Sequence, residues 1–268
     1  MGKGVEADYA RMADKWGNQE APRRAKARPG KPGRKSMLQR SNCYAASLLI
    51  IGLCTCNRLD ASEQERNLIR RIDSAELARE TNLAGYTVTE CYMIKNSHFS
   101  RPAEATVEMT YKRGEGKTYK VLSRSGPSLL QNAVLDGLIR EESQMSRGRL
   151  RQQAIITSAN YDMKLIAQKL VDGTMCDAIE LIPKRKSPYL LRGRMWVNAS
   201  DMMLVKIEGQ PPTSASFFEG RPEIVREYKQ IHGFSLAQHN HAVSSKFLVG
   251  QSTVDIDYRD YHVITTPR

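Results

Sequence analysis

The sequence predicts a mainly β protein with two helices (α+β). A single curled antiparallel sheet is expected to form an unclosed half-barrel, with the helices covering its concave face. About eleven short segments rich in β-forming residues follow one another between Tyr86 and Val263, separated by turn residues. Only two segments, 62–82 and 127–139, carry apolar residues at helical spacing. Many consecutive antiparallel strands favour one curled sheet that helices can cover.

The first helix is expected from Ser62 to about Asn82, because apolar residues including Leu68 and Ile72 recur there at helical spacing. The hydrophobic period then changes to that of β-strands. Three strands are expected next, at 86–94, 105–113 and 117–125. Gly114 and Gly116 indicate a hairpin between the last two strands, because a phosphate-binding loop needs a different spacing and a following helix.

A second helix is expected to open at Pro127, since proline is favoured in the first turn of a helix. Leu130, Val134 and Leu138 stand at i, i+4 and i+8, so they share one face of this helix. The polar segment 140–151 follows, and we expect it to be the end of the helix and an exposed loop.

The remaining chain is expected to be strands. Asp172-Gly173 predicts a tight turn into residues 174–209, which we interpret as three strands in the middle of the sheet. Pro183 ends the first of these strands, because proline cannot donate a ladder hydrogen bond. The expected strands are 161–171, 176–182, 189–197, 202–208, 215–219, 224–231, 234–238, 242–249 and 253–263.

The positive charge is concentrated at the beginning of the chain. The formal net charge is +12 over 268 residues, yet residues 1–36 hold ten Lys and Arg against four acids and thus carry half of it. The remaining chain is only mildly basic. Hydrophobic residues make up 40% of the whole sequence. We therefore expect no nucleic-acid partner, because a high pI without a basic face on the folded part is weak evidence for one.

The N-terminal region divides into two segments. Residues 1–36 lack hydrophobic periodicity, which favours a disordered basic extension. It is either a basic arm or a stretch upstream of a start at Met37. Residues 37–61 are signal-peptide-like, because the fourteen mostly apolar residues Cys43–Cys56 follow a short positive segment and are too few to span a membrane. We therefore expect an exported, periplasmic domain at 62–268, with the signal peptide removed.

Cysteines and catalytic motifs suggest no chemistry in this domain. Beyond the apolar run, only Cys91 and Cys176 remain, both on expected strands. They are able to pair in an oxidising compartment, but isolated strand cysteines are more often separate buried side chains. The sequence contains no G-x-S-x-G, H-E-x-x-H or C-x-x-C pattern. We accordingly expect no enzyme activity, no catalytic residue and no cofactor.

The candidate ligand-binding residues are Leu130, Val134, Leu138 and Trp196. The three helical residues are placed to fill the concave face of a half-barrel, where a ligand would compete with them. The alternative is that they simply complete the core, since an amphipathic helix on a sheet is the usual way to bury both faces. Trp196 shares a strand face with Arg192 and Arg194, which indicates either the rim of a cavity or an exposed ring flanked by cations.

Two histidines draw attention as possible metal ligands. His239 and His241 stand at i, i+2 and therefore share one face of a strand. No third ligand lies near them in the sequence, and a polar outer face explains them equally well. We expect no metal site.

Short motifs carry a resemblance to a known family. Leu181-Ile182-Pro183-Lys184, Arg194-Met195-Trp196-Val197-Asn198, Lys206-Ile207-Glu208-Gly209 and Asp257-Tyr258-Arg259-Asp260-Tyr261 resemble motifs of the periplasmic lipoprotein-carrier family, the LolA/LolB-like outer-membrane lipoprotein-sorting proteins. The order of helices and strands over most of residues 62–264 is also similar. The departure is Asn198, where an acid is commoner.

The resemblance implies an unclosed barrel with a helical lid and an apolar cavity that accepts acyl chains. The function it implies is binding of acyl chains of lipids or lipoproteins by a monomeric exported protein, as in transport across the bacterial envelope. The alternative is an envelope-stress sensor or regulatory protein that contacts an inner- or outer-membrane protein through the same fold. Fold alone does not choose between these functions.

Overall fold

The computed structural model describes residues 44–213, 221–246 and 250–266, and the side chains from Ser62 onward except Lys246. The chain divides into two compact units, Met1–Ile50 and Ile51–Arg268, and the second holds every strand described below. The expected basic extension and most side chains of the signal-like segment lie outside the described residues. Among the residues described, no helix combines the length and apolar character needed to cross a membrane.

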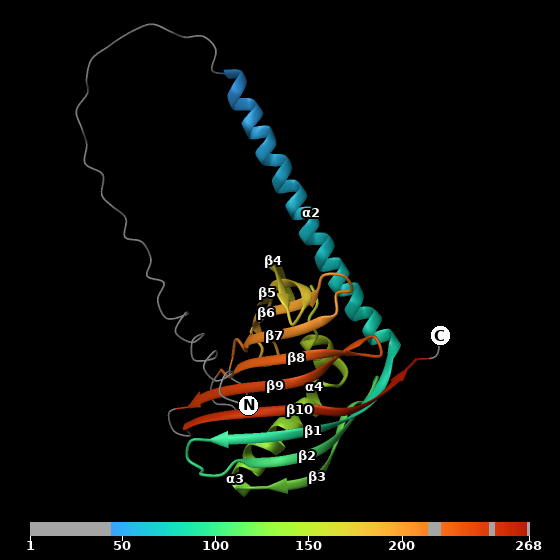
Figure 1. The fold of residues 1–268 in the computed structure, drawn as a ribbon, viewed down its shortest axis with the longest axis vertical. Coiled ribbons are helices and arrows are strands. Elements are labelled where there is room, and N and C mark those ends of the chain that lie inside the picture. Colours follow the sequence, from blue (N-terminus) through green and yellow to red (C-terminus); the bar gives the residue numbers. More distant parts are fainter. Residues whose placement is uncertain (1–43, 214–220, 247–249, 267–268) are drawn as a thin grey trace, which may run out of the picture. The chain divides into compact units, whose positions relative to one another are not determined.

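One antiparallel sheet of ten strands dominates the second unit (Figure 1). Its spatial order is β3-β2-β1-β10-β9-β8-β7-β6-β5-β4, and the described residues show no pairing between β3 and β4, so the barrel is not closed. The strands are β1 (Leu83–Asn96), β2 (Ala103–Lys112), β3 (Gly116–Ser125), β4 (Tyr161–Val171), β5 (Thr174–Pro183), β6 (Arg192–Asn198), β7 (Leu204–Gln210), β8 (Glu223–Ile231), β9 (Phe234–Lys246) and β10 (Gly250–Thr265).

Strand order explains where the helices lie. The chain leaves the sheet at one edge, β3, and re-enters at the other edge, β4, so the connecting segment must cross the sheet. That segment is helical: α3 (Ser128–Leu130), a π-helical turn η2 (Gln131–Leu135), α4 (Asp136–Met145) and α5 (Gly148–Ala154). It packs on the concave face, with α4 behind the sheet in Figure 1. The long helix α2 (Tyr44–Asn82) runs directly into β1.

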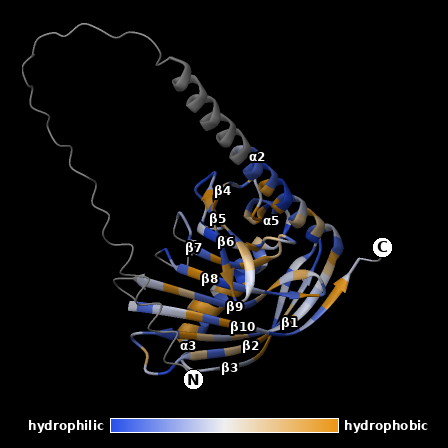
Figure 2. Cartoon of the chain, turned by 45° about the horizontal axis from the view of Figure 1, so that its top comes forward, coloured by the Kyte–Doolittle hydropathy of each residue, from blue (hydrophilic) through white to orange (hydrophobic). Residues whose placement is uncertain are grey.

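The buried core of the described residues consists of three clusters, and two of them include residues of the helices that cover the concave face. Leu130 and Leu135 of the connecting segment are buried against β1, β2 and β10, in a cluster that includes Val107 and Val254. Leu68 and Ile72 of α2 are buried in a second cluster, whose strand residues come from β4 to β7. Buried and accessible residues alternate along β2, and Figure 2 shows changes of hydropathy along the strands.

Turn chemistry agrees with the sequence. Gly114 and Gly116 have φ of 83° and 86°, which glycine adopts without strain, in the β2–β3 hairpin. Asp172 and Gly173 have φ of 47° and 80° in the β4–β5 turn. After β6, the Asn198 side chain accepts a hydrogen bond from the Ser200 backbone N–H at 3.0 Å. Turn formation thus explains the sequence Asn198-Ala199-Ser200.

Several element boundaries differ from the expectation. The segments expected as strands 234–238 and 242–249 are parts of the single strand β9, as far as it is described. The expected strand 215–219 lies outside the described residues. Strand β6 begins at Arg192 rather than at residue 189, because the chain before it turns and buries Leu190 completely. Residues 174–209 lie near one edge of the sheet, with only β4 beyond them, and not in its middle.

The polar segment 140–151 is the most instructive error. It is largely helical, because α4 continues to Met145 and α5 begins at Gly148. Two of its charged residues, Glu142 and Arg151, form ion pairs with distant elements, so their polarity did not indicate a loop. Cys91 and Cys176 are both free, with Cys176 buried, as expected for separate strand cysteines.

Candidate functional site: a two-sided cavity under the helices

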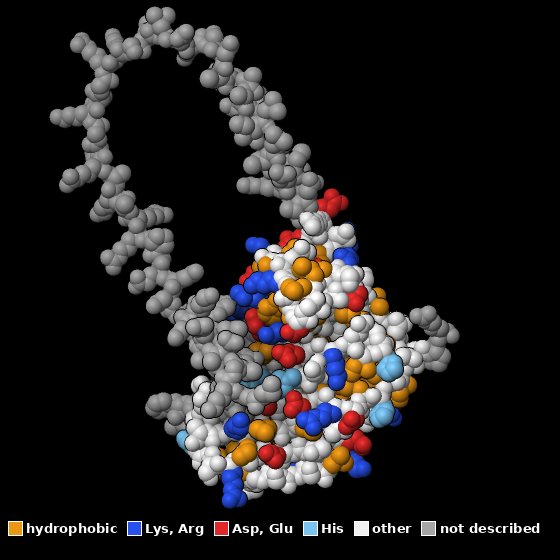
Figure 3. Space-filling view, in the orientation of Figure 1, with side chains coloured by type: hydrophobic (Ala, Val, Ile, Leu, Met, Phe, Trp, Pro, Cys, Tyr) orange, Lys and Arg blue, Asp and Glu red, His pale blue; other side chains and the backbone are white. Residues whose placement is uncertain are grey.

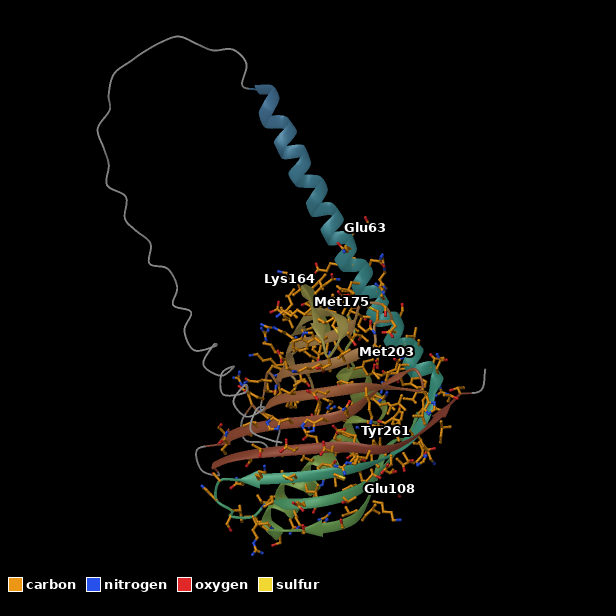
Figure 4. All side chains as sticks on the ribbon, in the orientation of Figure 1. Glu63, Glu108, Lys164, Met175, Met203 and Tyr261 are labelled. Atoms are coloured by element: carbon orange, nitrogen blue, oxygen red, sulfur yellow. The ribbon has the colours of Figure 1, made fainter. Side chains whose placement is uncertain are left out.

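A cavity of about 480 Å³ lies between the helices and the concave face of the sheet. Its size falls within the range of about 300–1,000 Å³ typical of small-molecule sites. Residues of α2, α4, α5 and strands β6 to β9 line it, together with the turn after β6. Met203 of that turn is labelled in Figure 4, close to α2.

One part of the cavity is apolar. Ile72 and Ala75 of α2 face Met195 and Val197 of β6 and Ile207 of β7 across it. Further apolar lining residues are Ala154, Ile155, Ile156, Tyr161, Leu191, Met202, Leu204 and Phe234. Such a surface has no hydrogen-bonding requirement, so it accepts a hydrocarbon chain without leaving polar atoms unpaired.

The other part of the cavity is charged. The Lys117 ammonium of β3 donates to Glu142 of α4 at 2.5 Å, and the Arg226 guanidinium of β8 lies 3.5 Å from the same carboxylate. Arg226 Nε also donates to the side-chain oxygen of buried Asn240 at 3.1 Å. Through these contacts α4 is bound to β3 at one edge of the sheet and to β8 farther along it.

The charges determine the protonation state of this part. Burial by itself would raise the pKa of Glu142, but the charges of Lys117 and Arg226 and their hydrogen bonds lower it to about 2. For Lys117, burial acts to lower the pKa, and the Glu142 charge outweighs it and raises the pKa. The three groups are therefore ionised at neutral pH. Nearby, burial raises the pKa of Glu90, whose carboxylate accepts a hydrogen bond from Tyr92 at 2.5 Å.

A second ionic cluster lies at the C-terminal end of α2. Arg79 lies 3.2 Å from Glu76 and 3.5 Å from Glu80, and Arg151 of α5 donates to Glu80. The Arg151 guanidinium also lies over the Tyr111 ring, 5.0 Å from its centroid. Burial raises the pKa of Glu76 in spite of the opposing charge of Arg79. Glu76, Arg79 and Arg151 all line the cavity, so its charged part has both cationic and anionic side chains.

The arrangement suits an amphipathic ligand. An alkyl chain fits the apolar part, while a polar or charged group at its end meets ionised side chains that are held in place by ion pairs.

The structure places the residues expected to bind ligand elsewhere. Leu130 is buried in the cluster over β1, β2 and β10, and Val134 and Leu138 pack against that cluster without lining the cavity. Trp196 alternates with the cavity-lining residues Met195 and Val197 and so lies on the opposite, convex face of β6. There the Lys206 ammonium lies 5.6 Å from the centroid of its ring. Ligand contact by the four residues stays a prediction.

The sequence contains only weak indications of the residues that line the cavity. Ile72 and Ala75 belong to the apolar stripe of segment 62–82, which predicts a covering helix but not a space beneath it. Glu142 and Arg151 stand in segment 140–151, which was expected to be the end of a helix and an exposed loop. Lys117 and Arg226 occur on strands far apart in the sequence, and only the curled sheet brings both to Glu142.

Comparisons with known proteins give structural likenesses only. A LolA superfamily protein from Nitrosomonas europaea is similar at 12% identity and a TM-score of 0.46, over 74% of this chain and 94% of that chain. A putative outer membrane lipoprotein-sorting protein domain from Vibrio parahaemolyticus is similar at 13% identity and a TM-score of 0.43, over 74% and 92%. The MucA/MucB complex of Pseudomonas aeruginosa matches at 10% identity and a TM-score of 0.23, over 72% and 92%.

No protein-family model matches the sequence, and a comparison with curated proteins finds no match. The likenesses to solved structures concern the fold alone at these identities. The ten-stranded open sheet with helices on its concave face is the unclosed half-barrel that the sequence predicted.

Proposed function

We propose that this chain is an exported periplasmic protein that binds an acyl chain of a lipid or lipoprotein in the cavity between α2, α5 and the sheet. The observation that carries the proposal is the cavity of about 480 Å³, with an apolar part formed by residues such as Ile72 and Met195 and a charged part around Glu142. Export is supported by the apolar run Cys43–Cys56 after a short basic segment.

The energetics fit reversible binding. Each buried methylene contributes about 0.8 kcal/mol, so a long chain gains several kcal/mol. Part of this gain is lost to the entropy of association and to the ordering of side chains. The lining side chains are themselves partly buried by one another, as Leu191 and Leu204 are. Exchanging their mutual contacts for contacts with an alkyl chain therefore changes the free energy of the protein little.

The test is binding of a fluorescent fatty acid and, separately, of a triacylated lipopeptide to the purified full chain. Ala75→Phe places a phenyl ring in the apolar part of the cavity from α2. We expect saturable uptake by the wild type and an affinity at least about tenfold lower in the variant, since the ring takes the volume of several methylenes. Ala154→Phe, which fills the cavity from α5, is expected to have the same effect.

Leu77→Phe is the matched control, because Leu77 lies on the same helix, is 68% exposed and does not line the cavity. Its affinity should equal that of the wild type. Near-UV circular dichroism checks that each variant keeps its tertiary packing. Absence of saturable uptake by the wild type would overturn the proposal, and so would unchanged affinity in both folded cavity variants.

A further inference from the structure

The convex face of the sheet carries a group of histidine and aspartate side chains that is separate from the cavity. In the β9–β10 ladder, His239 pairs with Asp257 and His241 with Asp255. Paired residues in a sheet share a face, and residues two apart on a strand share it too. The intervening residues Asn240 and Ile256 are buried on the concave side, so the four side chains point outward together.

This group brings three potential metal-ligand atoms close together. One ligand atom each from His239, His241 and Asp255 lies within 4.8 Å of the others. The Asp255 carboxylate is central: one of its oxygens lies 2.5 Å from Nδ1 of His241 and 3.9 Å from Nε2 of His239. Bonds of about 2.0–2.1 Å in a tetrahedral site place ligand atoms about 3.3 Å apart. Small side-chain rotations, which open the bond between His241 and Asp255, reach that spacing.

Asp257 supplies the contact that orients a metal-binding histidine. Its carboxylate lies 2.9 Å from Nδ1 of His239, which leaves Nε2 of the same ring directed toward Asp255. A carboxylate that accepts the N–H of a histidine fixes the tautomer and strengthens the other nitrogen as a ligand. The two aspartates thus have different roles: Asp255 would bind the ion, and Asp257 would hold the His239 ring through Nδ1.

The local surroundings allow access for an ion. His239, His241 and Asp255 are part-buried, with side-chain exposures of 34%, 25% and 26%. Glu227 of β8 pairs with His239 and adds another carboxylate to this face. On the face turned to the viewer in Figure 3, histidine and acidic side chains lie near one another over the sheet. Imidazole nitrogens with a carboxylate are the donor set of zinc sites.

We propose that His239, His241 and Asp255 form a Zn²⁺ site on the convex face of the sheet, with Asp257 positioning the His239 ring. Three protein ligands leave one coordination position for water or for a group of a partner. The sequence alone indicated no such site, because the third ligand comes from the next strand. Strand pairing brings Asp255 opposite His241 although 14 positions separate them.

The test is titration of the full chain, purified without a histidine tag, with Zn²⁺ alone by calorimetry, and with Co²⁺ by visible absorption. We expect one saturable ion per chain and a Co²⁺ spectrum of low-coordinate geometry. The double change His239→Ala/His241→Ala should abolish this binding. Asp257→Asn should weaken it by about 10- to 100-fold, as loss of a contact behind a metal ligand does.

The matched control is His262→Ala, because His262 is exposed on the same strand β10 but pairs with Thr87, away from the group. Its affinity for Zn²⁺ should be that of the wild type. The substituted residues lie on the convex face, and thermal unfolding of each variant checks that the fold persists. Asp255→Asn is a second, conservative variant in case the double histidine variant does not fold. No saturable binding by the wild type would overturn the proposal, as would equal affinity in the folded double and Asp255→Asn variants.

Discussion

The two halves of the concave face are both covered by helices, and the cavity found among the described residues lies under the helices of one half. Over β1, β2 and β10, the connecting segment packs Leu130 and Leu135 directly onto the sheet. Over β6 to β9, α2 and α5 leave a cavity of about 480 Å³ between themselves and the strands. An apolar helix stripe therefore does not by itself mark a binding site, because the same pattern serves a closed core.

Charge explains part of the difference. Across the sheet, one row of paired concave residues runs from Met195 through Ile207, Arg226 and Asn240 to Ile256. The row is apolar at both ends and polar in the middle. Arg226 needs a partner there, and Glu142 of α4 supplies it. This ion pair takes the place that packed apolar side chains occupy in the other half, and its residues line the cavity.

The largest expected effect is on stability in the closed half. Leu135 is 1% exposed, and Leu135→Ala should lower the free energy of unfolding by about 2–5 kcal/mol, since it leaves a new void. Leu204→Ala, the matched change at the cavity, should cost clearly less, because its side chain already borders empty space. Urea unfolding of both variants measures the difference. Equal losses would mean that the two halves are packed alike.

A smaller effect is expected from the ion pair that separates the halves. The pKa of Glu142 is about 2 in the folded protein against an ordinary 4.5, so its stabilising contribution is fully present above about pH 4.5. It is lost as the pH falls from there through about 2. A shift of this size corresponds to roughly 3 kcal/mol at neutral pH.

Glu142→Gln removes this titration. The variant should be less stable than the wild type at pH 7 by roughly 3 kcal/mol, and the gap should close as the pH falls toward 2. Urea unfolding at pH 7, 4 and 3 measures the gap. Comparing the two proteins at each pH cancels the opposite contributions of Glu76 and Glu90, whose pKa values burial raises. A gap independent of pH would show that Glu142 carries no such ion pair.

The sequence predicted the fold well where local chemistry decides it. The Asp172-Gly173 and Gly114/Gly116 turns and the alternation along β2 depend on neighbouring residues only, and the structure confirms them. Residues 140–151, expected to be a helix end and an exposed loop, belong largely to α4 and α5, and two of their charged residues, Glu142 and Arg151, find the partners Lys117 and Glu80 on distant elements. From the sequence alone, polar residues that form such ion pairs cannot be distinguished from polar residues exposed to solvent.

The candidate sites show the same limit. Alternation correctly separated Trp196 from Met195 and Val197, but nothing local says which of the two faces is concave. That depends on the curl of the whole sheet and on where the β3–β4 connection crosses it. In the same way, the pairing of β9 with β10 decides that Asp255 joins His241. Long-range pairing, not residue type, carries the missing information.

The smallest expected effect separates the two faces at Trp196. Trp196→Leu removes the contact of its ring with the Lys206 ammonium on the convex face, which should cost about 0.5–1 kcal/mol in urea unfolding. Binding of the fluorescent fatty acid should be unchanged, because the ring lies on the other side of the sheet from the cavity. If the affinity fell in Trp196→Leu but not in Ala75→Phe, the ligand would bind at the convex face, and the cavity on the concave face would be only a packing defect.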